Sequence, residues 1–403
     1  MRRVGTTLRA ARESARLPVE TVARLLGVQA DELLDIEESR ATPSMALMER
    51  TATLYGVSPS ALLRGEAQSS PATLLFRSAE EHRVDIGDLM RGEDLHVLGD
   101  FLVCASEVDT LKSTLGMPNA EIPSLEPEDL TEPEWQQGRD FAERTRQLLG
   151  LGDTPIPSMR SLLADRLGWE IFFVTPDVLS PSIDGASTIH PRPAILVNLL
   201  GGSASWWRTR ATLAHEMCHV LVDSRQGSRP YLISPEGTLK HRGVWTLVER
   251  FRGIERRANA FAAHFLVPRR SLFSLVSGTA ADSEEAIHKV CGHFGVGRQL
   301  AIRRLGHEFK LSTEVQTQML AREADKSHCS EHADADVEIG LRRGVLRSLV
   351  RRALEADKLS PLRARAILRV PMSAPLPDAI GGGPPMVSRA HVERTQALRD
   401  ELR

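Results

Sequence analysis

Hydrophobic positions near the start of the chain recur at helical spacing in short bursts. Gly27 and Gly56 interrupt the pattern, and Pro18, Pro43 and Pro59 stand where helices would begin. The bursts include Leu8, Val22, Leu26, Leu33, Ile36, Met48, Leu54 and Leu62. This pattern predicts four or five short helices in a compact all-α bundle over residues 1–66.

The polar pattern changes after this bundle. Residues 66–135 hold four basic and sixteen acidic side chains and end in the proline-punctuated run EIPSLEPEDLTEPEW. We therefore expect an acidic helical connector and linker over residues 67–134. Helical and strand-like patterns then alternate over residues 135–310, and residues 311–403 read as a helical extension with a flexible tail rich in proline and glycine.

Composition limits the class of protein. The chain has 403 residues, enough for several domains, and its 51 basic and 53 acidic side chains give a net charge of -2. No chain-wide cationic field therefore draws it to nucleic acid or membrane, so any such binding must be local. No uncharged run is long enough to span a bilayer, no secretory signal is evident, and the four cysteines have no C-x-x-C spacing. We expect a soluble cytoplasmic protein.

The run ATLAHEMCH places two histidines four residues apart. On a helix, the imidazoles of His215 and His219 emerge from one face, where both can coordinate the same ion. Glu216 lies beside them, within reach of a water molecule on that ion. The flanking residues are apolar, so a helix with two histidines and a glutamate would be costly to bury without a shared role. The alternative is a pair of hydrogen-bonded core histidines.

A zinc site needs a third ligand. The extended H-E-x-x-H-x-x-G-x-x-H pattern is excluded, because Val222 and Arg225 stand where glycine and histidine are needed. The downstream helical run GIERRANAFAAHFLVP places Glu255 and Asn259 on one face. We predict Glu255 as the third ligand and Asn259 as the acceptor for a ligand histidine's free N–H. Glu249 and Asp223 are the alternatives to Glu255.

The N-terminal run LRAARESARLPVETVARLLGVQADELLDIEESRATPSMALMERTATLYGVSPSALL resembles the Xre (Cro/repressor) helix-turn-helix family. The resemblance implies binding in the DNA major groove, usually as a homodimer, with Gln29 and Arg40 as candidate contacts. The expected recognition helix, residues 29–38, departs from the family pattern because it holds five acidic and no basic side chains. Acidic side chains oppose phosphate contact. A fold kept for dimerisation or for docking a partner is therefore the alternative.

The paired motifs ATLAHEMCH and E-x-x-A-N-x-F-A-x-x-F-L-V-P resemble the ImmA/IrrE family of metallopeptidases, over residues 135–305. The resemblance implies a zincin-like domain, a small mixed sheet with the HExxH helix, in an α+β multidomain chain. It also implies that His215, His219 and Glu255 hold Zn²⁺ and that Glu216 is the general base.

Substrate contacts follow from the same resemblance. The strand at residues 194–199, with Ile195 and Val197, is expected to form a sheet edge that pairs with an extended substrate. Tyr231 and His241 are the nearest candidates for an oxyanion donor. The long basic and aromatic stretch between Val222 and Glu255 departs from the family pattern and leaves the substrate preference open.

Three other features have simpler explanations. Cys218 is expected to be a small buried thiol, with a redox or ligand role as the alternative. His328, Cys329 and His332 lie together in an acidic stretch that is expected to be a solvated loop. The basic amphipathic run LRRGVLRSLVRRAL is expected to pack on the peptidase domain, with an anion-binding face as the alternative.

Together these features predict a zinc metalloendopeptidase fused to a helix-turn-helix domain. By resemblance, it would regulate genes by cleaving a repressor or antitoxin-like protein under stress or mobile-element induction. The alternative is a DNA-binding regulator whose peptidase-like domain acts as a sensor or partner-binding module, including toxin–antitoxin and phage-defence roles.

Overall fold

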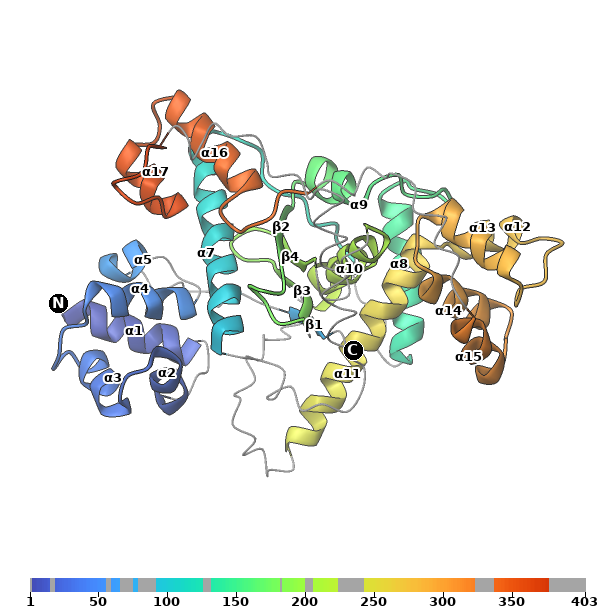
Figure 1. The fold of residues 1–403 in the computed structure, drawn as a ribbon, viewed down its shortest axis with the longest axis horizontal. Helices are drawn as coiled ribbons and strands as arrows, with labels where there is room; N and C mark the ends of the chain where they lie inside the picture. Colours follow the sequence, from blue (N-terminus) through green and yellow to red (C-terminus); the bar gives the residue numbers. More distant parts are fainter. Residues whose placement is uncertain are drawn as a thin grey trace.

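A computed structural model gives the fold, which is mixed α+β and mostly helical (Figure 1). Among the helices it describes, none is long and apolar enough to cross a membrane. The structure describes residues 2–14, 19–55, 59–65, 75–78, 92–125, 132–181, 183–199, 206–223, 243–322 and 337–376.

The described part of residues 2–65 forms five helices, as predicted. Gly27, with a φ of 65°, turns the chain between the second and third helices, a conformation that glycine adopts without strain. Ser44 caps the fourth helix by accepting a 3.1 Å hydrogen bond from the backbone N–H of Leu47. The helices are α1 (Arg2–Ser14), α2 (Val19–Leu26), α3 (Ala30–Glu37), α4 (Met45–Leu54) and α5 (Pro59–Arg64).

Four strands of the described chain form one mixed sheet in the order β1-β3-β4-β2. The strands β2 and β4 are parallel, and the other two pairs are antiparallel. The strands are β1 (Leu75–Ser78), β2 (Glu170–Val174), β3 (Ile183–Thr188) and β4 (Ala194–Asn198).

One expectation about the sheet is wrong. The strand with Ile195 and Val197, β4, lies between β3 and β2, so both its edges are already paired and it cannot accept a substrate strand. Pairing on both sides explains its uninterrupted apolar run, which fits a central strand better than an edge. The connector, expected to be helical with a linker, contains the helix α7 (Gly92–Thr114) and also a short strand, because its residues 75–78 pair with β3.

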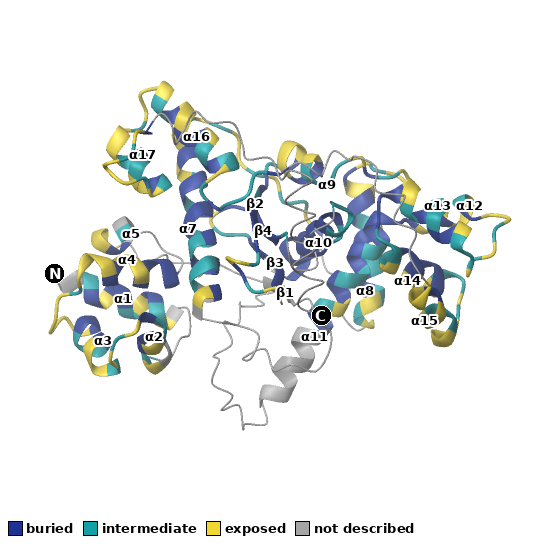
Figure 2. Cartoon of the chain, viewed as in Figure 1, coloured by how far each residue is buried: buried dark blue, intermediate teal, exposed yellow. Residues whose placement is uncertain are grey.

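The two faces of the sheet are covered by different helices. Side chains alternate along β4, with Leu196 in one apolar core and Ile195 in the other. The first face packs on α7 (Gly92–Thr114), where Phe101 meets Phe172 edge-on at 5.6 Å. The other face packs on α10 (Trp206–Cys218), so the sheet is the middle layer of three (Figure 2).

The helix α7 stands between the N-terminal bundle and the sheet (Figure 1). A Cβ at Gly99 would lie 1.8 Å from the carbonyl oxygen of Thr53, so the α7–α4 contact requires glycine there. The C-terminal helices α16 (Gly344–Glu355) and α17 (Pro361–Leu368) belong to the same core. The run LRRGVLRSLVRRAL therefore packs mainly on the connector helix and only touches the sheet at β2, which corrects its expected docking on the peptidase domain.

The remaining helices share the second apolar core with α10. The helix α8 crosses α11 closely at Gly138, where a Cβ would lie 2.3 Å from the carbonyl oxygen of Arg257. The helix α10 continues into a π-helical turn, His219–Asp223. The other elements are α8 (Glu134–Leu148), α9 (Met159–Ser161) with a π-helical turn (Leu162–Arg166), α11 (Gly243–Leu266), α12 (Arg269–Leu275), α13 (Glu284–Phe294), α14 (Arg298–Glu308) and α15 (Thr313–Ala321).

Candidate metal centre

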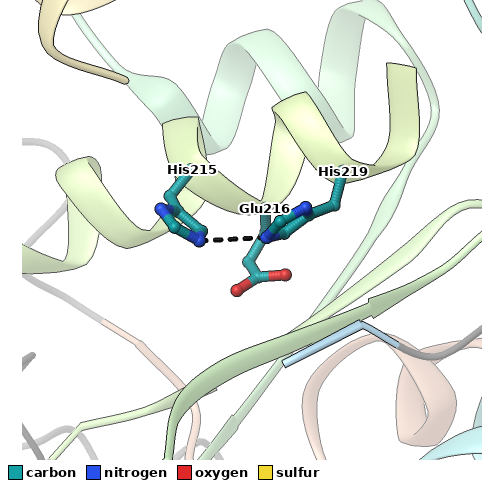
Figure 3. A group of neighbouring side chains, drawn as sticks. All are labelled: His215, Glu216 and His219. Carbon is teal, nitrogen blue, oxygen red and sulfur yellow. Dashed lines mark hydrogen bonds between the residues drawn. The ribbon is translucent and has the colours of Figure 1, made fainter. Parts of the chain in front are cut away.

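The centre is built on the end of α10. His215, Glu216 and His219 are fully buried there, and the Glu216 carboxylate points toward the sheet (Figure 3). Their helix is apolar on the faces that meet β3, β4 and α11, which fixes its position without using the three polar side chains. The chain changes to a π-helical turn at His219, and such turns are frequent at functional sites.

Two imidazoles and one carboxylate converge on a single point. The Nε2 atoms of His215 and His219 lie 3.0 Å apart. Glu255, on α11, places its Oε2 3.2 Å from Nε2 of His215 and its Oε1 3.4 Å from Nε2 of His219. The predicted third ligand is therefore brought to the histidine pair by the packing of α11 on α10.

The outer nitrogens of both rings have acceptors. The Nδ1 atom of His215 lies 3.2 Å from Oδ1 of Asn259, and Nδ1 of His219 lies 2.7 Å from Oδ2 of Asp223. A proton on each Nδ1 satisfies both contacts and leaves both Nε2 lone pairs directed inward. Two lone pairs and a carboxylate at this separation repel one another unless a cation lies among them.

Asp223 is held in place by a second chain of contacts. Its Oδ1 accepts a hydrogen bond from Arg257, whose Nη1 donates to Oε1 of Gln137 at 2.8 Å. Both Asp223 and Arg257 are buried. The packing of α8 on α11 therefore fixes the carboxylate that orients His219.

A residue of the sheet orients Glu216, the candidate general base. The hydroxyl of Ser187, on β3, donates a 2.8 Å hydrogen bond to Oε2 of Glu216. Two residues away, a Cβ at Gly185 would lie 2.9 Å from Cγ2 of Thr212 and 3.0 Å from Oε1 of Glu216. Glycine thus lets β3 approach α10 closely enough for Ser187 to reach the carboxylate.

The donor set fits zinc. Ligands at 2.0–2.1 Å from a tetrahedral Zn²⁺ ion lie about 3.3–3.4 Å from one another. The two Nε2 atoms are somewhat closer than that, at 3.0 Å. The distances from Nε2 of His215 to Oε2 of Glu255, 3.2 Å, and from Nε2 of His219 to Oε1 of Glu255, 3.4 Å, are close to it. Two nitrogens and one carboxylate oxygen also match the ligand types of catalytic zinc sites, which keep the fourth position open.

Electrostatics favour a positive charge at the same point. Burial lowers the pKa of His219, but its contacts with Asp223 and Glu255 outweigh burial and raise this pKa to about 10. Burial raises the pKa of Glu255, but His215 and His219 outweigh it and lower this pKa to about 2. The site therefore stabilises a cation between the rings and the carboxylate, whether a proton or a metal ion.

The other sequence candidates have different outcomes. Asp223 contacts His219 through the ring's outer nitrogen, so it orients a ligand and does not join the donor set. Cys218 is fully buried, and burial raises the pKa of its thiol well above the usual value, as expected for an inert thiol. The candidates Tyr231, His241, His328, Cys329 and His332, together with the side chain of Glu249, lie outside the described residues.

Sequence reasoning gave Ser187 no role in the site. The strand residue is 29 positions from Glu216, so no local spacing relates the two. The contact of Asp223 with His219 was indicated by the sequence, because Asp223 follows His219 by one helical turn and a carboxylate there can reach the ring.

A second histidine cluster lies beside arginines, which disfavour a further positive charge there. His264, His307 and Glu308 lie close enough to share an ion, but Nη1 of Arg304 lies 3.4 Å from Nε2 of His264 and donates to Glu308 at 2.7 Å. Burial and the neighbouring arginines lower the pKa of His264 to about 2. The cluster already contains a cation, so we interpret it as a structural ion pair with a neutral histidine.

The acidic α3 helix is paired with arginines. Glu37 is buried and accepts from Arg12 at 2.7 Å. Arg40, exposed after the helix, donates to Asp35 at 2.8 Å and also pairs with Glu38. Gln29 is exposed at the N-cap of α3 and makes no capping bond through its side chain.

Comparison with known families identifies the N-terminal bundle. Residues 3–64 match a family described as a helix-turn-helix domain. The chain therefore carries a helix-turn-helix domain, the kind of domain found in DNA-binding regulators. No curated protein matches the chain, and no solved structure matches it.

Proposed function

We propose that the chain is a zinc-dependent endopeptidase joined to a DNA-binding helix-turn-helix domain, and that it regulates gene expression by cleaving a repressor or antitoxin-like protein. The observation that supports the peptidase most directly is the convergence of His215, His219 and Glu255 beside Glu216. The helix-turn-helix match at residues 3–64 supports the regulatory part.

In this proposal His215, His219 and Glu255 hold the ion. Bound zinc supplies a Lewis acid that polarises a peptide carbonyl and lowers the pKa of water. Asn259 and Asp223 keep both rings turned with Nε2 inward. This outer contact also strengthens the rings as ligands.

Glu216 moves the proton. Its carboxylate removes a proton from the attacking water and later delivers it to the nitrogen of the leaving amine. Ser187 donates to Oε2 of this carboxylate, which fixes the direction of the carboxylate. The hydroxyl therefore acts on the reaction through Glu216, as a positioning residue.

A second candidate function is a DNA-binding regulator whose metal-site domain senses a signal or binds a partner. One observation favours it: His215, Glu216 and His219 have no exposed surface in this structure. Of the four residues at the centre only Glu255 is partly exposed, at 18% of its side chain. A site buried to this extent is suited to holding an ion for structure or sensing.

The test compares new protein N-termini in native cells that express the wild type or Glu216→Gln, with and without DNA damage or oxidative stress. A cut that appears only with the wild type supports the peptidase and identifies its substrate. Identical N-termini under every stress, with promoter occupancy intact in both strains, would reject cleavage and favour the sensor. The metal content of both purified proteins is measured in parallel, because equal zinc shows that only the base was removed.

A further inference from the structure

The outer edge of β3 is covered by a strand from elsewhere in the chain. Residues 75–78 of the connector form β1, which pairs antiparallel with β3 and ends the sheet on that side. In the register, Leu75 lies opposite Ser187 and Arg77 lies opposite Gly185. Ser187 donates a hydrogen bond to Glu216, and a Cβ at Gly185 would lie 3.0 Å from Oε1 of the same side chain.

Without β1, the other three strands would leave β3 as an edge. A free edge presents unpaired N–H and C=O groups to any extended peptide, and peptides commonly bind proteins by adding a strand in this way. The strand β1 also contacts α10, the helix that contains His215 and Glu216.

The pairing of β1 is short. It covers four residues, and the register shifts between Arg77 and Ser78. A shift of register interrupts the regular ladder of hydrogen bonds. A ladder of this length contains few hydrogen bonds. Displacing β1 by a competing strand therefore costs little free energy.

We infer that the outer edge of β3 is a binding site for an extended peptide and that residues 75–78 are its resident occupant. A substrate segment must displace β1 before it can lie along Ser187 and Gly185. This inference rests on the proposed function only in naming the bound peptide as substrate. It makes the connector an internal competitor of the substrate, which links the state of the connector to access to the site.

The test uses the full chain with Leu75→Pro and Phe76→Pro together. Successive N–H groups along a strand point to opposite sides, so two adjacent prolines remove one donor that faces β3. The matched control, Leu75→Ala with Phe76→Ala, keeps both N–H groups. All proteins also contain Glu216→Gln, so that the probe is bound and not cleaved.

The probe is a fluorescein-labelled peptide that copies residues 71–82, and binding is measured by fluorescence anisotropy. If β1 fills the edge 90–99% of the time, the apparent affinity of the wild-type edge is reduced about 10- to 100-fold. We expect the proline variant to bind the probe tighter by that factor and the alanine variant to bind as weakly as the parent. Equal binding by all three proteins would overturn the inference.

Restoring Glu216 separates this inference from the proposed function. With zinc, the proline variant should cleave labelled unfolded casein about tenfold faster than the wild type or the alanine variant. Tighter peptide binding without cleavage by any protein would keep the peptide site and reject the peptidase. Equal cleavage with equal peptide binding would keep the peptidase and reject β1 as its competitor.

A second variant covers the case in which two prolines unfold the domain. Phe76 and Ala186 are opposite in the register, so Phe76→Cys with Ala186→Cys can lock β1 on β3 by oxidation. We expect the oxidised protein to lose binding of the probe and the reduced protein to recover it. Unchanged binding after complete oxidation would contradict displacement of β1.

Discussion

The hydroxyl of Ser187 on β3 donates a 2.8 Å hydrogen bond to Oε2 of Glu216 on α10. This contact joins the sheet to the candidate base, so we expect Ser187→Ala to lower kcat and leave KM and zinc content nearly unchanged. The loss of one hydrogen bond to a charged group corresponds to about a tenfold or larger effect on rate. Ser187→Thr, which keeps the hydroxyl, is the control, and an alanine variant with full kcat would remove Ser187 from the mechanism.

The proposed roles of the residues in the centre, general base and metal ligand, predict two different effects of substitution. Glu216→Gln should keep zinc and lose about 10²-fold or more in cleavage, because the amide cannot accept the proton. His219→Ala and Glu255→Ala should lose the metal itself, because each removes one of three protein ligands. Metal analysis and peptide hydrolysis on the same samples distinguish the two. Cleavage by Glu216→Gln at the wild-type rate would reject the base assignment.

The contact of Asp223 with His219 predicts an effect on metal affinity. Asp223→Asn should weaken zinc binding about 10- to 100-fold, because loss of such an outer partner leaves the ligand ring less basic and less fixed. The matched control is Asp184→Asn, which alters another buried carboxylate, on β3, paired with an arginine, Arg208. Competition with a chromophoric chelator measures both affinities. Equal affinity in the two variants would show that Asp223 only supports the fold.

The negative charge of α3 predicts that neutralising its exposed acidic side chains increases the affinity for DNA. Asp31 and Glu32 are exposed in the first turn of α3, beside Gln29. Asp31→Asn with Glu32→Gln should tighten binding to duplex DNA a few-fold at low salt, with a smaller gain at high salt because exposed charges are screened. Glu285→Gln, an exposed acid on α13, is the control. Titration by anisotropy at several salt concentrations measures the effect, and identical affinities would place the DNA contact elsewhere.

The buried His264 predicts a loss of stability in mild acid. Burial and Arg304 lower its pKa from 6.5 to about 2, so below pH 6.5 the unfolded chain takes up a proton that the folded chain does not. The contribution of His264 to the free energy of unfolding is therefore constant above pH 6.5 and falls between pH 6.5 and 2. At pH 5.5 it has fallen by about 1.4 kcal/mol. Urea unfolding at pH 7.5 and 5.5 should show a smaller difference for His264→Gln than for the wild type. His293→Gln, an exposed histidine, should behave as the wild type.

The parts of the fold that were predictable have local causes. The helix-turn-helix bundle follows from short apolar bursts and from a glycine at the turn, and the histidine pair follows from the spacing of residues on one helix. Glu255 and Asn259 were found because their own helix carries a recognisable face. In each case the signal lies within a few turns of the chain.

The parts that were missed depend on contacts between distant segments. Nothing in four residues of the connector indicates that they pair with β3, because pairing is made by backbone groups that every sequence has. The central position of β4 and the role of Ser187 follow from that order of strands, so they were missed together. The docking of α16 on α7 was missed for the same reason, since an amphipathic helix does not specify its partner.

The position of α7 has a consequence for how the chain unfolds. Apolar residues of the helix-turn-helix bundle, one sheet face and the C-terminal helices belong to a single core around this helix. Arg342 and Arg369 add ion pairs from the C-terminal segment to Asp100 on α7, and Arg369 also donates to Thr53 of the bundle. We therefore expect these three parts to unfold as one cooperative unit, so that a truncation in the bundle or in the C-terminal helices destabilises the other.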